Sequence, residues 1–310
     1  MMPRIRWGLC CQFLDSPIRF RTATHRYVHG LEPDVRRAYL TAIARANAQA
    51  LHDAVDRCEQ LGIGAFRINS QILPLVTHPA SGYRLADLDD DGSIAAAFAA
   101  AGARAREADV RLSFHPDQFV VLNSEQERVV VSSLAEMQAQ GEIAELVGAD
   151  VLTLHGGGAA GGMAAALERL ERGVERLSDA ARVRLALEND DRSFTPEALL
   201  PVCERLGVPL VYDVHHHRCN PDSLDADTAT ARAAATWGAR EPYFHISSPR
   251  SGWDGDARPH ADYVARGDVP ESWRGMRVTV DVEAKAKERA VLALRDAMAA
   301  PGTSAVPPAA

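Results

Sequence analysis

The chain has 310 residues, of which 46% are hydrophobic and 25% charged, and its formal net charge is −8. This composition is ordinary for a globular enzyme and excludes a mainly disordered or collagen-like chain. No run approaches the roughly 18–20 apolar residues that span a bilayer. The first residues lack the apolar core of a signal peptide, so we expect a cytoplasmic protein.

The charge is unevenly distributed. Residues 1–50 contain eight arginines against Asp15, Glu32 and Asp34, a local charge of +5. The overall negative charge argues mildly against a nucleic-acid partner, because cations on phosphates supply most of that affinity. Bound divalent metals would, however, add positive charge where the formal count places carboxylates. A nucleic-acid partner therefore stays compatible with the composition.

Short β-rich runs alternate with helical periodicity along the chain. Strands are predicted at Ile5–Leu9, Ala65–Ile68, Arg111–Phe114, Val151–Leu154, Arg184–Leu187, Pro209–Tyr212, Tyr243–Ile246 and Arg277–Val282. Helices are predicted at Asp34–Leu61, Ser93–Ala108, Gln126–Val147, Met163–Asp179 and Pro196–Leu206. The last of these begins with proline at its first position and is followed by glycine, as helices commonly are.

Eight strand candidates with intervening helices predict a single-domain α/β protein, a (β/α)8 TIM barrel, with a doubly wound open sheet as the alternative. We expect the barrel domain to occupy residues 1–298 and a disordered tail to occupy residues 299–310, which are rich in Pro, Gly, Ala and Ser. The Gly/Asp/Ser-rich segment Ser247–Arg258 is predicted to be a long loop.

Polar side chains follow the carboxyl ends of strands three to eight: His115, His155, Glu188, Asp213, His245 and Glu283. His216 and His260 lie close enough in sequence to reach the same place. Strand carboxyl ends converge on one face of a barrel, where active sites are built. Imidazoles and carboxylates suit Zn, Mn, Fe or Co. We therefore predict two or three divalent ions, with Glu188 as a bridge, that activate water for an in-line phosphoryl displacement.

Three features allow more than one interpretation. His215 and His217 flank His216. Each of the two could bind a metal ion, or it could lie behind the ligands or at the surface. The glycines after His155 either hold a phosphate at a helix N-terminus or allow close backbone approach beneath the metal site. They lack the GK[ST] of a P-loop, so no nucleotide cofactor is expected. The five cysteines show no disulfide spacing, which indicates reduced thiols.

Nine segments together resemble the UV damage endonucleases of the metal-dependent TIM-barrel endonuclease superfamily. They are Arg19–Thr22, Pro74–Pro79, Ser113–Phe119, Leu154–Gly157, Leu187–Asp191, Asp213–His217, His245–Ser248, His260–Tyr263 and Val282–Lys285. The similarity runs over residues 4–296. No single segment is specific, but their combination in this order is.

The resemblance implies incision of damaged double-stranded DNA immediately 5′ of a UV photoproduct (a cyclobutane dimer or a 6-4 product), leaving a 3′-hydroxyl and a 5′-phosphate. It also implies divalent ions, generally manganese. The implied metal ligands are His115, His155, Glu188, Asp213, His216, His245, His260 and Glu283. Glu188, His245 and Lys285 are the candidate catalytic residues.

The resemblance places a Gln–aromatic pair, here Gln118 and Phe119, in the duplex where the damaged bases flip out. Arg19, Arg21 and Arg67 are the candidate phosphate contacts. A monomer and no membrane partner are expected.

Four positions depart from the pattern that some members show. Gln71 stands in place of a further histidine ligand, Tyr243 in place of a modified lysine, and Leu9 and Phe13 in place of lesion-contacting residues. Two other functions stay open: a metal-dependent sugar or hydroxy-acid isomerase on the same barrel, and a lesion-binding protein without catalysis.

Overall fold

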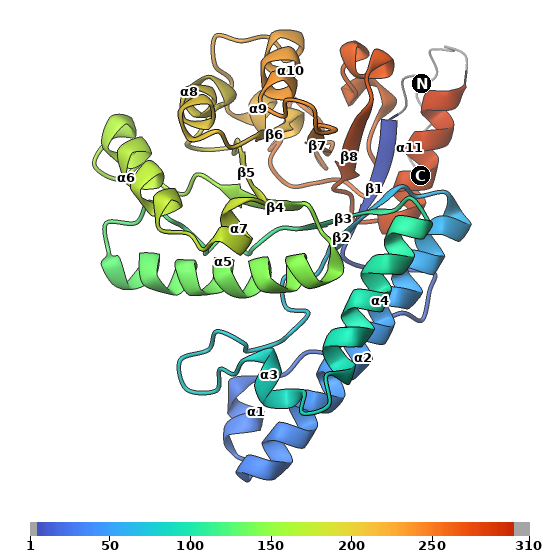
Figure 1. Cartoon of the computed structure of the whole chain (residues 1–310). Helices are drawn as coiled ribbons and strands as arrows, with labels where there is room; N and C mark the ends of the chain where they lie inside the picture. The colour runs from blue at the N-terminus through green and yellow to red at the C-terminus, as the bar shows by residue number, and fades with distance from the viewer. Residues whose placement is uncertain (1–4, 301–310) are drawn as a thin grey trace.

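The computed structural model describes residues 5–300, which form a closed barrel of eight parallel strands (Figure 1). The strands are β1 (Ile5–Cys10), β2 (Ala65–Ile68), β3 (Arg111–Phe114), β4 (Val151–His155), β5 (Leu185–Glu188), β6 (Leu210–Asp213), β7 (Tyr243–Ile246) and β8 (Val278–Val282). They pair in sequence order, and β1 closes the barrel against β8. The predicted TIM barrel is thus confirmed, and the open sheet is wrong.

Helices surround the barrel in the alternation expected from the sequence. They are α1 (His25–His29), α2 (Pro33–Leu61), α3 (Leu85–Leu88), α4 (Ser93–Glu107), α5 (Glu127–Val147), α6 (Met163–Glu175), α7 (Asp179–Arg182), α8 (Pro196–Leu206), α9 (Val214–Cys219), α10 (Ala226–Ala235) and α11 (Lys287–Ala299), with 3-10 turns η1 (Arg266–Asp268) and η2 (Glu271–Gly275). The one long helix predicted at Met163–Asp179 is wrong at its end, because α6 stops at Glu175 and α7 starts a separate turn.

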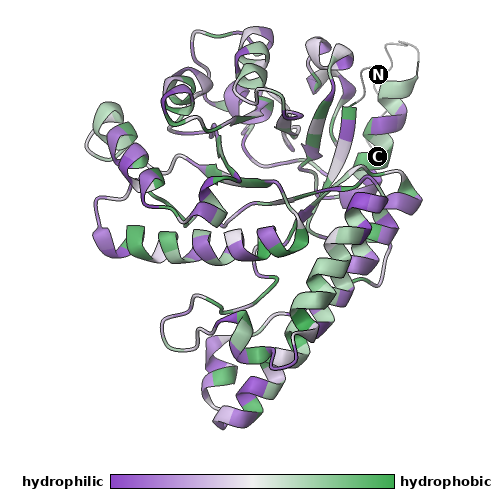
Figure 2. Ribbon diagram, in the orientation of Figure 1, coloured by the Kyte–Doolittle hydropathy of each residue, from purple (hydrophilic) through white to green (hydrophobic). Residues whose placement is uncertain are grey.

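The strands are short and almost wholly buried, since helices cover the outside of a parallel barrel. On α5 the buried residues recur every three or four positions, for example Val130, Ser133 and Met137. Figure 2 shows the resulting alternation of hydrophobic and hydrophilic bands along α5. None of the described helices combines the length and hydrophobicity that a bilayer span needs.

A small lobe projects from the barrel on the side of the strand carboxyl ends. It consists of α1, α3, the connection 69–84 and the first turns of α2 (Figure 1). The 29 residues of α2 span about 43 Å at 1.5 Å per residue, far more than a barrel strand. Because α2 runs back toward the strand amino ends, its first half stands beyond the mouth of the barrel and supports this lobe.

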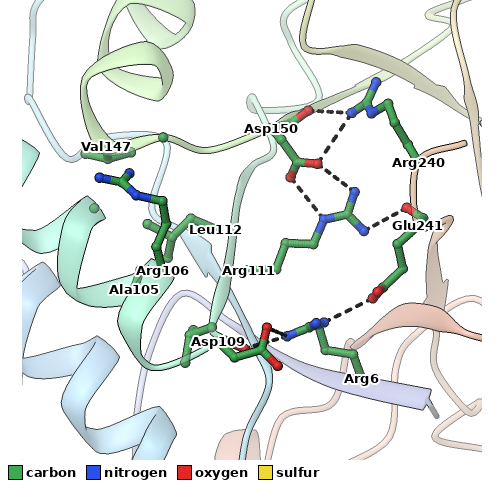
Figure 3. A pocket seen from close by; sticks show the side chains of 13 residues that line it. Arg6, Ala105, Arg106, Asp109, Arg111, Leu112, Val147, Asp150, Arg240 and Glu241 are labelled. Carbon is green, nitrogen blue, oxygen red and sulfur yellow. Dashed lines mark hydrogen bonds and ion pairs between the residues drawn. The ribbon is translucent and has the colours of Figure 1, made fainter. Parts of the chain in front are cut away.

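The opposite end of the barrel is closed by ion pairs around a cavity of about 370 Å³ (Figure 3). Arg111 binds both carboxylate oxygens of Asp150, at 3.0 and 2.8 Å, and Arg6 pairs with Glu241 at 3.0 Å. Arg240 lies 3.6 Å from Asp150. These half-buried charges pair with one another, which is the stabilising role expected at the amino-terminal end of a TIM barrel.

Two irregular segments were predicted. Residues 247–265 contain no regular strand or helix, and a single bridge between Pro249 and His260 folds this segment back on itself. The predicted tail at 299–310 lies, from residue 301 onward, outside the described residues.

Candidate active site

The eight predicted metal ligands gather at the carboxyl ends of the strands, and the Glu188 carboxylate lies at their centre. One oxygen, Oε2, lies 2.8 Å from His115 Nε2 and 3.6 Å from His155 Nε2. The other, Oε1, lies 2.9 Å from His245 Nδ1 and 3.4 Å from His216 Nδ1. Side chains separated by up to 130 residues thus converge on one buried carboxylate.

Two overlapping groups have the spacing of a metal site. Within each group the potential ligand atoms lie within 4.8 Å of one another: His115, His155 and Glu188 in the first, and Glu188, Asp213 and His216 in the second. Asp213 Oδ2 is buried and has no hydrogen-bond partner among residues 5–300. An unpartnered buried carboxylate oxygen is costly unless a cation compensates it. The donor set therefore fits divalent ions, with Glu188 shared between the two groups.

The local chain explains how Asp213 and His216 come together. Asp213 is the N-cap of α9, and its Oδ1 accepts the backbone N–H of His216 at 2.8 Å. This cap leaves Oδ2 free and holds it 3.5 Å from His216 Nδ1. The Asn189 amide fixes the same turn through two hydrogen bonds with the backbone of Asp213.

Backbone carbonyls orient two of the imidazoles. Pro116 O lies 2.9 Å from Nδ1 of His115, and Asn189 O lies 3.0 Å from Nδ1 of His216. In His115 a protonated Nδ1 that donates to the carbonyl leaves Nε2, which faces Glu188, as the lone-pair nitrogen, the arrangement common for metal-binding histidines.

The other predicted ligands extend the cluster toward β8. His245 Nδ1 lies 3.6 Å from Glu283 Oε1, and His260 Nδ1 lies 3.7 Å from Glu283 Oε2. Arg67, predicted as a phosphate contact, donates from Nη1 to Glu283 at 2.5 Å and is mostly buried. Its guanidinium therefore already neutralises a carboxylate of the cluster, and its DNA contact stays a prediction.

Charge pairing dominates the electrostatics of the cluster. Burial by itself would lower the pKa of His245, but the carboxylates of Glu188, Glu283 and Asp281 raise it to about 9. Burial would raise the pKa of Glu188, yet the surrounding histidines hold it well below its ordinary value. By contrast, burial lowers the pKa of His155. The raised pKa of His245 favours its protonated form at neutral pH when no metal is bound.

Asp281 belongs to this site and was missed in the sequence. It is fully buried in β8, and its Oδ1 accepts the Tyr243 hydroxyl proton at 2.8 Å. Its Oδ2 has no hydrogen-bond partner in the described chain and lies 3.8 Å from Arg67 Nε and 3.9 Å from His245 Nε2. The signal was available: Asp281 is a charged residue in an apolar strand, two positions before Glu283 and therefore on the same face.

Gly8 makes room for Asp281, since the two residues are partners in the β1–β8 register. A Cβ built on Gly8 would lie 2.2 Å from Asp281 Oδ1. We expect Gly8→Ala to displace that carboxylate and to lower the free energy of unfolding by about 1–3 kcal/mol, as overpacking does. Thermal unfolding measures the loss, and titration with manganese shows whether the cluster is weakened.

The matched control for this prediction is Gly267→Ala, because nothing lies within 4 Å of a Cβ at that position. Equal melting temperatures and equal manganese affinities for the two variants would contradict the role given to Gly8.

The structure locates the two histidines beside His216 and the glycine-rich loop after His155. His217 is buried and bonds the Tyr212 hydroxyl at 2.8 Å and Asp222 at 2.9 Å, so it supports the fold. The His215 ring packs at centroid distances of 5.3 Å from Trp253 and 5.2 Å from His260, behind the cluster. A Cβ on Gly157 would lie 2.2 Å from Asn123 Oδ1, which favours the close-approach interpretation of this loop.

The predicted lesion-contacting pair lies at the tip of the β3–α5 loop. Gln118 is exposed, and Phe119, at 77%, is the most exposed large hydrophobic residue of the described chain. The carbonyl of Asp117 accepts the backbone N–H of Val120 at 2.8 Å and folds the tip. The Phe119 ring is therefore accessible to a partner, as the predicted contact with the lesion requires.

The remaining predicted residues lie around this centre. Arg19 and Arg21 are exposed on the lobe side, with Arg21 stacked over Tyr39 at 5.8 Å. Lys285 is exposed beyond the end of β8. Gln71 is exposed and lies outside the metal groups. Leu9 and Phe13, which the resemblance placed at lesion-contact positions, are buried in the core.

Comparison with known proteins identifies the family. The model of the UV-endonuclease UvdE family matches residues 5–306. The UV DNA damage endonuclease of Deinococcus radiodurans is 35% identical over 304 residues, covering 93% of this chain and 94% of that protein. That of Bacillus velezensis is 32% identical, covering 94% and 91%. The crystal structure of SacUVDE shares the fold, with a TM-score of 0.83 at 23% identity over 95% of this chain and 98% of that one.

Proposed function

The chain belongs to the UV-endonuclease UvdE family, and from this membership we propose that it nicks DNA immediately 5′ of UV photoproducts, leaving a 3′-hydroxyl and a 5′-phosphate. The observation that carries the proposal is the cluster around Glu188, in which four imidazoles lie within 3.6 Å of one carboxylate. Two or three divalent ions, with manganese as the proposed metal, would be bound there by His115, His155, Glu188, Asp213, His216, His245, His260 and Glu283.

The chemistry divides between the ions and the side chains. Divalent ions supply Lewis acidity toward the phosphate and make water a stronger nucleophile at neutral pH. Glu188 faces His115 with one oxygen and His245 with the other, and it is the one residue that the two groups share. His245 is held between Glu188 and Glu283. Lys285, two residues after Glu283, adds positive charge at the rim, where the substrate phosphates pass.

Damage recognition is assigned to Gln118 and Phe119. A step that has lost its normal stacking costs less to open than an intact one. The exposed Phe119 ring can then fill the gap left by the flipped bases, and the Gln118 amide can bond what they leave unpaired. An isomerase acting on a small sugar would have no use for an aromatic ring standing in solvent beside its site.

Phe119→Ala tests this assignment. We expect the preference for a dimer-containing duplex over an intact one to fall by about 5- to 150-fold, because a stacked aromatic contributes about 1–3 kcal/mol per base. Metal content should stay unchanged. Fluorescence anisotropy with paired duplexes measures the preference. Val183→Ala, which trims another strongly exposed hydrophobic residue before β5, is the control; the same preference in both variants would refute the assignment.

A plasmid assay tests the proposed function as a whole. We expect manganese-loaded protein to relax supercoiled plasmid that has been irradiated with UV and to leave the unirradiated plasmid closed. Selective binding to irradiated plasmid without relaxation would identify the protein as a non-catalytic lesion binder. Neither binding nor relaxation would refute the nuclease and make ketose or hydroxy-acid isomerisation the next reaction to assay.

A further inference from the structure

Lysine is almost absent from this chain. Of its 34 cationic Lys and Arg residues, 32 are arginines, and the two lysines are Lys285 and Lys287. Both line one cavity of about 410 Å³ at the mouth of the barrel, together with Arg67, Arg258, His260 and Glu283. If lysine were scattered at random among the cationic positions, both copies would seldom meet in a single cavity. At every other cationic position the chain has arginine, so lysine occurs only at this cavity.

The charges of this cavity are not balanced. Arg67 is paired with Glu283, and Arg258 lies 3.2 Å from Asp191. Neither Lys285 nor Lys287 has a carboxylate within 4.0 Å in the part of the chain that the structure describes. Two uncompensated ammonium groups beside a candidate metal ligand create a local positive potential that attracts anions.

The backbone holds the lysine segment against the opposite wall of the cavity. Lys285 N–H donates to Ala261 O at 3.1 Å, and Ala286 N–H donates to Asp262 O at 3.0 Å. Lys287 has a left-handed backbone, with φ of 50°, which unbranched non-glycine residues adopt only at some cost. Such strain is retained where the surroundings enforce it, often at functional sites. The backbone at Lys287 is thus set in place, and its side chain is half-buried.

We propose that Lys285 and Lys287 bind a backbone phosphate of the DNA adjacent to the one that is cut, and so place the scissile bond at the cluster. The proposal assigns a role to Lys287, which no motif had singled out, and it rests on the proposed function. The two ammonium groups would attract the negatively charged phosphodiester as point charges. Glu283 and His260, which are predicted metal ligands, line the same cavity, so this phosphate site adjoins the metal site.

The test is the salt dependence of binding to an undamaged duplex, since phosphate contacts do not depend on sequence or damage. Lys287→Met keeps the length of the side chain and removes its charge. We expect it to reduce the slope of log Kd against log salt by about 0.9, the value for one lost phosphate contact. Lys285→Met should do the same, the double variant should lose about twice as much, and Lys287→Arg should restore the slope.

Arg232→Met is the matched control, because it removes one positive charge from α10, where Arg232 lies 3.9 Å from Glu204. A slope for Lys287→Met equal to that of this control, in a protein that still binds DNA, would overturn the lysine site alone. Failure of Lys287→Arg to restore the slope would also overturn it, since charge would then not be the cause. A wild-type protein that binds no duplex at all would instead refute the proposed function.

Discussion

We expect Glu188→Gln to lower the rate of incision by more than about 100-fold while leaving DNA binding in place. The substitution keeps the shape of the side chain, but it removes the negative charge that faces His115, His155, His216 and His245 within 3.6 Å. An amide nitrogen also donates where the carboxylate accepted. Substitution of residues that only orient metal ligands lowers activity or metal affinity about 10–100-fold. Loss of the shared carboxylate should therefore lower the incision rate by more than about 100-fold. Gel analysis of a dimer-containing duplex measures the rate.

Glu168→Gln provides the matched control, because Glu168 is exposed on α6 and lies 3.9 Å from Arg172, away from the cluster. It should cut at the wild-type rate. If Glu188→Gln with verified metal content also cuts at that rate, Glu188 is not at the centre of the catalytic site.

We expect metal binding to the metal-free protein to strengthen as the pH rises. The pKa of His245 is raised to about 9, and that of His216 lies well above its ordinary value, because carboxylates surround both rings despite their burial. Each ring must lose its proton before it can bind a metal ion. Manganese affinity should therefore rise about tenfold per pH unit for each displaced proton, up to about pH 9. Calorimetry in buffers of different ionisation enthalpy counts the protons released.

We expect the same protons to stabilise the metal-free fold at low pH. A group whose pKa is raised on folding contributes its stability below the unfolded pKa of about 6.5 and loses that contribution as the pH passes the folded value. His245→Gln should reduce both the proton release and the affinity. His52→Gln, on the outer face of α2, should change neither, and proton release that is equal in both variants would contradict the account.

The barrel was predictable because its signals are local. Each strand is a short β-rich run, and the predicted and observed strand bounds agree within a residue or two. Helix ends also have local signals, such as the glycine at position 207 that follows the last residue of α8, Leu206. The site was predictable for a topological reason, since residues after strands three to eight must meet at one end of a barrel. This is why Glu188 and His115, 73 residues apart, could be placed together.

Other features required coordinates. Asp281 shares a face with Glu283, but only the register with Gly8 shows that its carboxylate has space. Phe119 was named by resemblance, whereas its solvent exposure is a property of the folded loop. The meeting of Lys285, Lys287 and Arg258 in one cavity depends on how residues 247–265 fold back over the mouth, and no periodicity encodes that path.

The central claim is that the cluster around Glu188 cuts DNA 5′ of a photoproduct, and one assay tests it most directly. A labelled duplex with a single cyclobutane dimer is incubated with the protein, with and without manganese, beside the intact duplex, and the product ends are mapped. The account predicts a manganese-dependent nick at the phosphate immediately 5′ of the dimer, with a 3′-hydroxyl and a 5′-phosphate. An uncut dimer duplex in the presence of metal-loaded protein, or equal cutting of the intact duplex, would contradict it.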